Sequence, residues 1–131
     1  MAANSTMYDV HFYGSQQDLK AIDDAFAKKE QEVKDSGEFD YDFWEFLEVY
    51  DPRRHGIREY EQCLADAWKM ECFFKELKAS YPNVEISGEV RIAFIGGDYS
   101  ETNIKISSER GSPELKWEET YKDEEDWGEE D

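Results

Sequence analysis

The sequence is poor in the residues that build disulfide scaffolds, metal centres and membrane spans. Its 131 residues include two cysteines, three prolines and two histidines, and no stretch approaches the ~20 apolar residues that a membrane-spanning helix needs. Two cysteines are too few for a disulfide framework, and no apolar segment near Met1 resembles a signal peptide. We therefore expect a soluble, cytoplasmic protein with both cysteines reduced and no contact with a membrane.

Sequence motifs that carry chemistry are also missing. His11 and His55 are the only histidines, and no HExxH, CxxC, GxxxxGK or GxGxxG pattern is present. The turn at Gly96, Gly97 and Asp98 lacks the alternating oxygen ligands of an EF-hand loop. With 33 acidic residues, some carboxylates meet by chance, so a close pair would not indicate acid–base catalysis. The sequence therefore favours a protein without enzymatic activity, cofactor or metal.

Basic residues are scarce relative to acidic ones. Lysine and arginine number 15 against 33 aspartates and glutamates, which leaves a net charge of −18. A negative field of this size repels nucleic acids and anionic membranes and attracts basic proteins. Hydrophobic residues still make up 39% of the chain and aromatic residues 15%, enough for one folded domain with its own core. We therefore expect a basic protein as partner, and no direct nucleic-acid binding.

The stretch from Tyr60 to Phe94 organises the expected fold. Apolar residues spaced alternately three and four positions apart predict one long helix from Tyr60 to Tyr81, which Pro82 ends. Alternation of apolar and polar residues from Val84 to Phe94 then predicts a strand with one apolar face. The helix must lie across that face of a sheet, because both elements would otherwise leave apolar surface in water.

Similar patterns predict the remaining elements. After a frayed start at residues 1–6, residues 8–13 alternate as a strand, and residues 15–33 carry the spacing of a helix. Residues 103–108 and 115–117 alternate again, as strands of an antiparallel meander.

The expected fold is therefore α+β, with two main helices packed on one face of a mainly antiparallel sheet of four or five strands. The order of elements resembles a ferredoxin-like split βαβ arrangement with an added meander. The expected core comprises Val10, Phe12, Leu19, Ile22, Phe26, Ala67, Met70, Phe74, Leu77, Ile86, Val90, Ile92, Ile104 and Ile106.

Residues 38–51 contain six acidic and six aromatic residues and no basic residue. We expect a strand-like entry followed by a short helix, with Asp42 and Glu45 as its capping box. In the simpler interpretation, the aromatic side chains fill the core and the acids face water. In the alternative, the segment is an exposed aromatic and acidic surface that binds a partner.

Two further segments have biased charge. Arg53, Arg54 and Arg58 form a basic cluster, which we expect to neutralise neighbouring carboxylates or to hold an acidic tail. That tail is so acidic that like-charge repulsion should keep it disordered. The expected organisation is a single domain at residues 1–117 followed by a disordered tail at residues 118–131.

These observations lead to one main functional hypothesis. DNA carries one charge per ~1.7 Å of its axis, and an acidic protein surface can imitate it and occupy a basic groove. In composition the chain resembles phage-encoded inhibitors of host nucleases, the anti-CRISPR and anti-restriction proteins, which implies a nuclease or another nucleic-acid-binding protein as partner. The expected contacts are Glu38, Asp40, Asp42, Trp44, Glu45, Glu48, Glu85, Glu89, Asp123, Glu124, Glu125 and Asp126.

Other hypotheses stay open, and one of them, an enzyme with a nonstandard site, has no positive support in the sequence. The protein could be a structural or assembly module without catalytic activity that binds a partner, or a second copy as a homodimer, through an aromatic surface or a sheet edge. Either the first strand or the strand at Leu115 would supply that edge. In the simplest case, the charge only keeps a small protein in solution. Salt separates these hypotheses, because added salt weakens binding through acids far more than binding through apolar surface.

Overall fold

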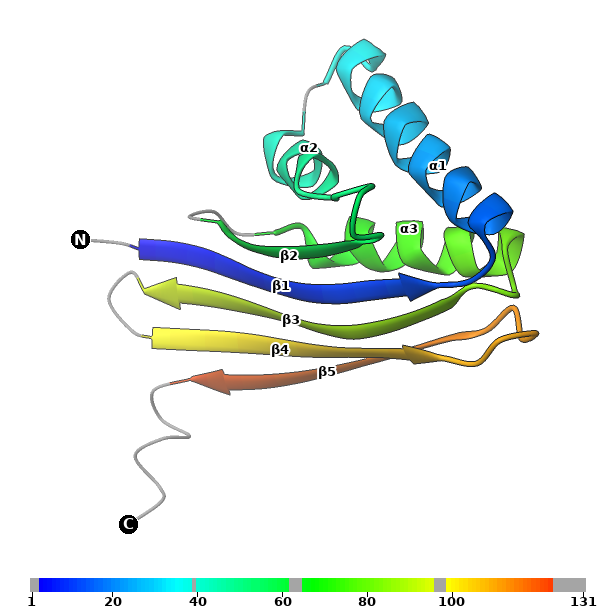
Figure 1. The fold of residues 1–131 in the computed structure, drawn as a ribbon. Helices are drawn as coiled ribbons and strands as arrows, with labels where there is room; N and C mark the ends of the chain where they lie inside the picture. The colour runs from blue at the N-terminus through cyan, green and yellow to red at the C-terminus, as the bar shows by residue number, and fades with distance from the viewer. Residues whose placement is uncertain (1–2, 39, 62–64, 96–98, 124–131) are drawn as a thin grey trace.

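Three helices cover one face of a five-stranded antiparallel sheet in the part of the chain that the computed structural model describes, residues 3–38, 40–61, 65–95 and 99–123 (Figure 1). The elements are β1 (Ala3–Tyr13), α1 (Gln16–Asp35), α2 (Tyr41–Glu48), β2 (Gly56–Glu61), α3 (Ala67–Ser80), β3 (Glu85–Ile95), β4 (Tyr99–Ser108) and β5 (Leu115–Asp123). Across the sheet the strands follow the order β2-β1-β3-β4-β5. This arrangement confirms the predicted α+β class.

The strand directions differ from the expected ferredoxin-like arrangement. In a split βαβ unit, strands joined by a crossover helix run parallel. Here β1 and β3 pair antiparallel along their whole length, with Tyr8 opposite Val90. The other neighbour of β1 is β2, a strand that the sequence analysis does not predict, so β1 lies inside the sheet and not at its edge. The edges are β2 and β5, and the edge position expected for the strand at Leu115 is confirmed.

Short polar side chains cap the first two helices. Ser15 accepts a hydrogen bond from the backbone amide of Asp18 at 3.1 Å and starts α1 where the sequence predicts a helix. Asp40 caps α2 in the same way. The capping box predicted at Asp42 and Glu45 is therefore wrong, because the helix begins earlier than that box requires.

The third helix is shorter than the apolar spacing predicts. Asp66 accepts a hydrogen bond from the amide of Lys69 at 3.0 Å, and α3 begins at Ala67. Tyr60 belongs instead to β2. Its place in the three-and-four spacing is a coincidence, because apolar residues of a strand and a connection can fall at helical intervals by chance. Cys63, which the same prediction placed in the helix, lies outside the described residues.

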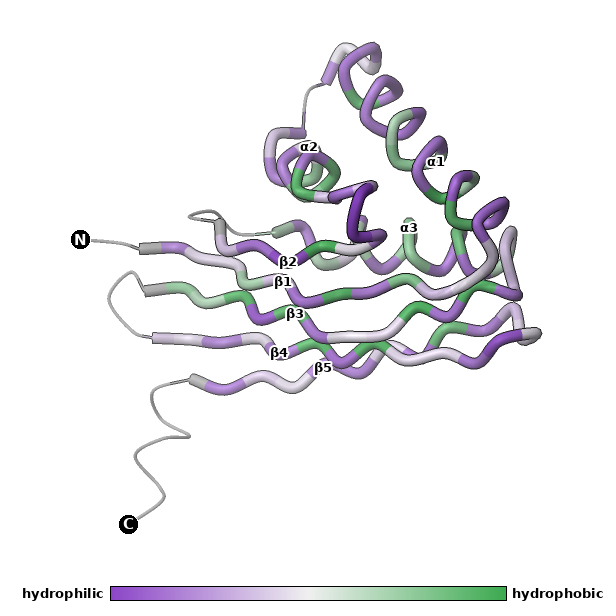
Figure 2. The backbone as a smooth tube through the Cα atoms, in the orientation of Figure 1, coloured by the Kyte–Doolittle hydropathy of each residue, from purple (hydrophilic) through white to green (hydrophobic). Residues whose placement is uncertain are grey.

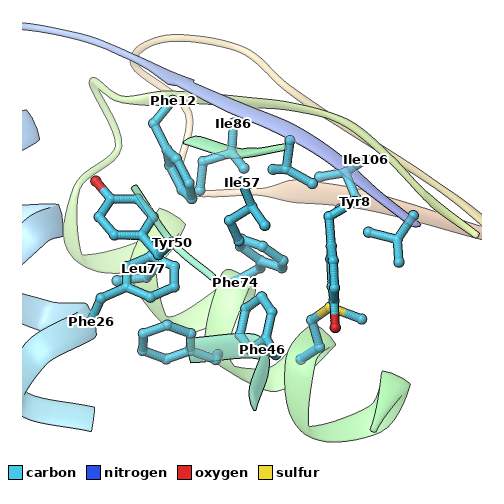
Figure 3. Packing of buried hydrophobic residues seen from close by; sticks show 14 of the residues in the cluster. Tyr8, Phe12, Phe26, Phe46, Tyr50, Ile57, Phe74, Leu77, Ile86 and Ile106 are labelled. Atoms are coloured by element: carbon cyan, nitrogen blue, oxygen red, sulfur yellow. The ribbon is translucent and has the colours of Figure 1, made fainter. Parts of the chain in front are cut away.

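The core lies between the sheet and the helices (Figure 3). Alternate residues of β1 enter it, so that Tyr8, Val10 and Phe12 are buried while the side chains between them reach the opposite face of the sheet. Figure 2 shows that hydrophilic residues occupy much of α1. Every residue of the expected core packs in this cluster, and three are only partly buried: Leu19, Ala67 and Ile92.

The aromatic residues of the α2 segment belong mainly to that core. Phe43 and Phe46 are buried, and Tyr50 stacks on Phe26 of α1 with ring centroids 4.0 Å apart. Tyr41 instead faces solvent, with 54% of its surface exposed. The simpler interpretation of this segment therefore holds for most of its described aromatic side chains.

Two strands of the sheet, β1 and β5, are longer than predicted. β1 begins at Ala3, so residues that were expected to fray take part in strand pairing. β5 runs to Asp123, so residues 118–123 of the expected disordered tail form a strand paired with β4. The rest of that tail, residues 124–131, and the predicted turn at residues 96–98 lie outside the described residues.

Candidate protein-binding surface

The side of α2 that faces away from the core carries three carboxylates in a row. Asp42, Glu45 and Glu48 follow one another at intervals of three residues, which places them on one side of the helix. Their Cα atoms advance about 4.5 Å along the helix axis from one to the next. Because the opposite side of α2 is buried through its aromatic and leucine side chains, the amphipathic pattern fixes the direction in which the carboxylates point.

A hollow of about 570 Å³ adjoins this row, between α2, the turn that follows it and β2. Its lining includes Glu45 and Glu48, the exposed Glu59 of β2, and one basic residue, Arg53. The hollow therefore extends the row of carboxylates onto the sheet edge. We call Asp42, Glu45, Glu48 and Glu59 the α2 acidic face.

The carboxylates next to the α2 acidic face form ion pairs with basic side chains, whereas those of the face itself form none within the described residues. Asp40 pairs with Lys69, and this hydrogen bond holds the pKa of Asp40 below its usual value. Asp51 lies 3.5 Å from Arg53 and 3.7 Å from Arg54, and the backbone amide of Arg53 lowers its pKa. The basic cluster thus neutralises a neighbouring carboxylate, as predicted. No basic side chain among the described residues forms an ion pair with the α2 acidic face.

Like charges crowd Asp42 in particular. Partial burial, followed by the negative charges of Asp40, Asp66 and Glu45, raises the pKa of Asp42 above its ordinary value of 3.8. The surroundings of Asp42 therefore disfavour the ionised form of its side chain. A cation placed beside Asp42 would relieve this repulsion.

Two aromatic rings border the same surface. Tyr41 is exposed, and its ring centroid lies 6.1 Å from that of the half-buried Trp44. The ammonium group of Lys34 lies 6.0 Å from the centroid of the Trp44 ring, so a cation already stacks on an aromatic ring at this site. Aromatic side chains commonly supply the dominant contacts of protein interfaces. The surface therefore combines negative charge with aromatic rings.

The structure does not bring the remaining predicted contact residues to the α2 acidic face. Glu38 is exposed just before α2. Glu85 and Glu89 lie on β3, on the side opposite to the buried Val90 and therefore away from the helices. Asp123 ends β5, at the sheet edge opposite β2. The last three predicted residues lie outside the described part of the chain: Glu124, Glu125 and Asp126.

Glu59 is the member of the α2 acidic face that the sequence analysis does not predict. Its strand is short, with Ile57 and Glu59 on one side and Arg58 and Tyr60 on the other. Each side of the strand therefore carries one apolar and one charged residue, so no alternation of apolar and polar residues marks it in the sequence. The helical spacing that begins at Tyr60 also overlaps its last residues.

A polar cluster holds the end of α2 in place beneath the acidic face. Tyr50 donates a hydrogen bond to the carboxylate of Asp23 in α1, and Nδ1 of His55 lies 3.4 Å from the same oxygen atom. Burial, and then the interaction with Asp23, raises the pKa of Tyr50. The cluster joins α1 to the connection between α2 and β2, and so fixes the position of the hollow.

The described ranges contain neither a candidate metal site nor a membrane-spanning helix. No group of three or more histidine, cysteine, aspartate or glutamate side chains there could hold a metal ion. No helix in the same ranges is long and apolar enough to cross a membrane. No protein-family model, curated protein or solved structure gives a significant match to this chain.

Proposed function

We propose that this protein binds a basic protein through the α2 acidic face and occupies a nucleic-acid-binding surface as a mimic of DNA. The carboxylates of Asp42, Glu45 and Glu48, without ion-pair partners among the described residues, are the observation that carries this proposal. The residues that carry them advance about 4.5 Å along the helix axis at each step, and one DNA strand places a phosphate about every 3.4 Å. Flexible lysine and arginine side chains on the partner can meet either spacing.

The surroundings of this row support the same function. Partial burial and, after it, the neighbouring carboxylates raise the pKa of Asp42, and a cation from a basic partner would offset this cost of ionisation. Tyr41 offers an exposed ring beside the charges. A net charge of −18 would also steer a basic protein toward the chain and speed their association at low salt. The proposed class is a phage-type inhibitor of a host nuclease or of another DNA-binding protein, without catalytic activity of its own.

Capture from cell lysate, followed by a competition assay, tests this function. Proteins that bind the immobilised chain at low salt are eluted with a salt gradient, and each is then mixed with a labelled DNA duplex. We expect a basic protein that elutes at moderate salt and releases the duplex when the free chain is added. A variant carrying Asp42→Lys, Glu45→Lys and Glu48→Lys should neither capture that protein nor displace the duplex.

A matched control separates the α2 acidic face from total charge. Glu76, Glu109 and Glu114 are exposed and form no ion pair within the described residues, and their triple replacement by lysine changes the net charge by the same amount. This control variant should compete almost as well as the wild type. The proposal is wrong if both variants fail alike, or if the captured protein withstands high salt and does not bind DNA.

A further inference from the structure

β5 forms one edge of the sheet and is paired on one side only. Its 9 residues pair with β4 from Leu115 to Asp123. On its outer side, no backbone hydrogen bond from another described residue reaches it. A strand edge of this length presents unpaired N–H and C=O groups, which can accept a further strand.

The charges of β5 select one register for a second β5. On the face away from the helices, its side chains are Lys116, Glu118, Thr120 and Lys122. In an antiparallel pair with a two-fold axis at Thr120, Glu118 of each copy lies opposite Lys122 of the other. An axis at Glu119 gives a longer pairing, but Lys116 then lies opposite Lys122 twice and Glu119 lies opposite itself. Opposite charges across strands stabilise a sheet and like charges destabilise it, so the register at Thr120 is favoured.

The same register continues a charge pattern that exists within one copy. Glu118 lies opposite Lys105 of β4, and Lys122 lies opposite Glu101. A row across the new interface would therefore run Lys105, Glu118, then Lys122 and Glu101 of the second copy, with the sign alternating at each step. Glu118 also pairs with Lys116 of its own strand at 3.1 Å, but both side chains are solvent-exposed and such a pair contributes little.

We propose that a second copy of this chain pairs with β5 in this register, so that the two sheets join edge to edge in a homodimer. This interface goes beyond the proposed function and does not depend on it. β5 lies at the opposite edge from β2, which contributes Glu59 to the α2 acidic face (Figure 1). The dimer would therefore leave both acidic faces free and present two binding surfaces at its two ends.

Salt distinguishes this dimer from binding of a basic partner. Two copies that each carry a charge of −18 repel one another at low salt over about 30 Å, and over only about 8 Å at 0.15 M. The opposite charges paired across the interface are in contact and are screened less. Dimerisation should therefore strengthen as salt rises from about 0.01 M to about 0.15 M, whereas binding of a basic partner weakens over the same range.

Sedimentation velocity of charge variants tests the register. At about 0.15 M salt, Glu118→Lys and Lys122→Glu should each raise the dissociation constant of the dimer tenfold or more, because each creates two like-charge pairs. An equimolar mixture of the two variants should recover the dimer, because every pair across the mixed interface is again of opposite sign. Failure of the wild type to dimerise overturns the proposal, as does a mixture that stays monomeric.

Cysteine cross-linking gives a second readout that does not rely on charge. In a background with Cys63→Ser and Cys72→Ser, a Thr120→Cys variant should form a disulfide-linked dimer on mild oxidation. Residues paired across antiparallel strands have Cα atoms about 4.5 to 5.5 Å apart, within the range that a disulfide spans. Glu119→Cys should not cross-link, since residue 119 lies opposite residue 121 in this register. Cross-linking through residue 119 instead of 120 would overturn the register.

Discussion

Lys78 donates a hydrogen bond from its buried ammonium group to the backbone carbonyl of Glu109, at 2.7 Å, and so ties α3 to the turn between β4 and β5. The same group donates to the carbonyls of Pro82 and Val84 at 2.7 and 2.8 Å. Burial lowers the pKa of Lys78, because the charged form loses its hydration. Its three N–H donors nevertheless each have an acceptor, so three carbonyl dipoles take the place of a carboxylate.

Replacing Lys78 by methionine should lower the free energy of unfolding by about 3 kcal/mol, because three carbonyls lose their donor. Lys75→Met is the matched control, since Lys75 is exposed on the same helix and pairs with Glu71 four residues earlier. The control should change the stability by no more than about 0.5 kcal/mol. Urea unfolding followed by circular dichroism measures both variants. If both variants lose the same stability, the three hydrogen bonds to carbonyls contribute no more than the exposed ion pair of Lys75.

Gly88 permits the close approach of β1 and β3. Its φ is +144°, and a Cβ atom at this position would lie 2.0 Å from the backbone oxygen of Asp9. Gly88→Ala should therefore cost about 3 kcal/mol or more, or prevent folding. Gly111 also has a positive φ, of +88°, but nothing lies within 4 Å of its Cβ position. Gly111→Ala should cost only about 1 to 2 kcal/mol, and thermal unfolding that ranks the two variants equally would refute the prediction.

Burial of Tyr50, together with its hydrogen bond to Asp23, should make stability depend on pH in the alkaline range. The pKa of Tyr50 is raised in the folded state, so the protonated form favours folding. This contribution is complete below the ordinary tyrosine pKa of 10.0 and is lost as the pH rises above it. Tyr50→Phe should cost about 1 to 2 kcal/mol at neutral pH.

Urea unfolding at several pH values checks the alkaline dependence. The stability of the wild type should fall more steeply above pH 10 than that of the Tyr50→Phe variant. Tyr60→Phe provides the control, because Tyr60 is 57% exposed on β2, and it should leave both the stability and its pH dependence unchanged. Parallel curves for wild type and Tyr50→Phe would contradict the expected role of Tyr50.

The sequence predicts those elements whose apolar period is long and uninterrupted. β3 and the core face of β1 follow from strict alternation, and α1 follows from its spacing together with Ser15 as its cap. The same patterns do not predict β2, because the strand is short and one buried apolar residue, Ile57, cannot form an alternation. Without β2, the sequence pattern leaves β1 as one of two candidate edge strands and extends the predicted third helix back to Tyr60.

The candidate site is predicted only where its residues are neighbours in sequence. Asp42, Glu45 and Glu48 share one short helix, so composition alone singles them out. Glu59 reaches the same hollow through pairing of β2 with β1, a long-range contact that local periodicity does not encode. Charge alone groups Glu89 with them, but the alternation of β3 turns Glu89 to the opposite face of the sheet.

Asp42→Asn should reveal a conflict between stability and binding. Asp40 already supplies the carboxylate that caps the start of α2, so the charge of Asp42 mainly adds the costs of partial burial and of repulsion by its neighbours. Its raised pKa means that the ionised form opposes folding, and this cost appears as the pH rises above 3.8. At neutral pH, Asp42→Asn should therefore stabilise the fold by a few tenths of a kcal/mol, because solvent screens so exposed a charge.

The same substitution should weaken capture of the basic partner, because one carboxylate of the α2 acidic face is lost. Asp24→Asn is the control, since Asp24 is exposed and pairs with Lys20 at 2.9 Å. It should bring no gain in stability and no loss of partner binding. Urea unfolding at pH 7 and near pH 3.5 should show the gain of Asp42→Asn shrinking at the lower pH. A variant that is stabilised and still binds fully would mean that repulsion at Asp42 is unrelated to binding.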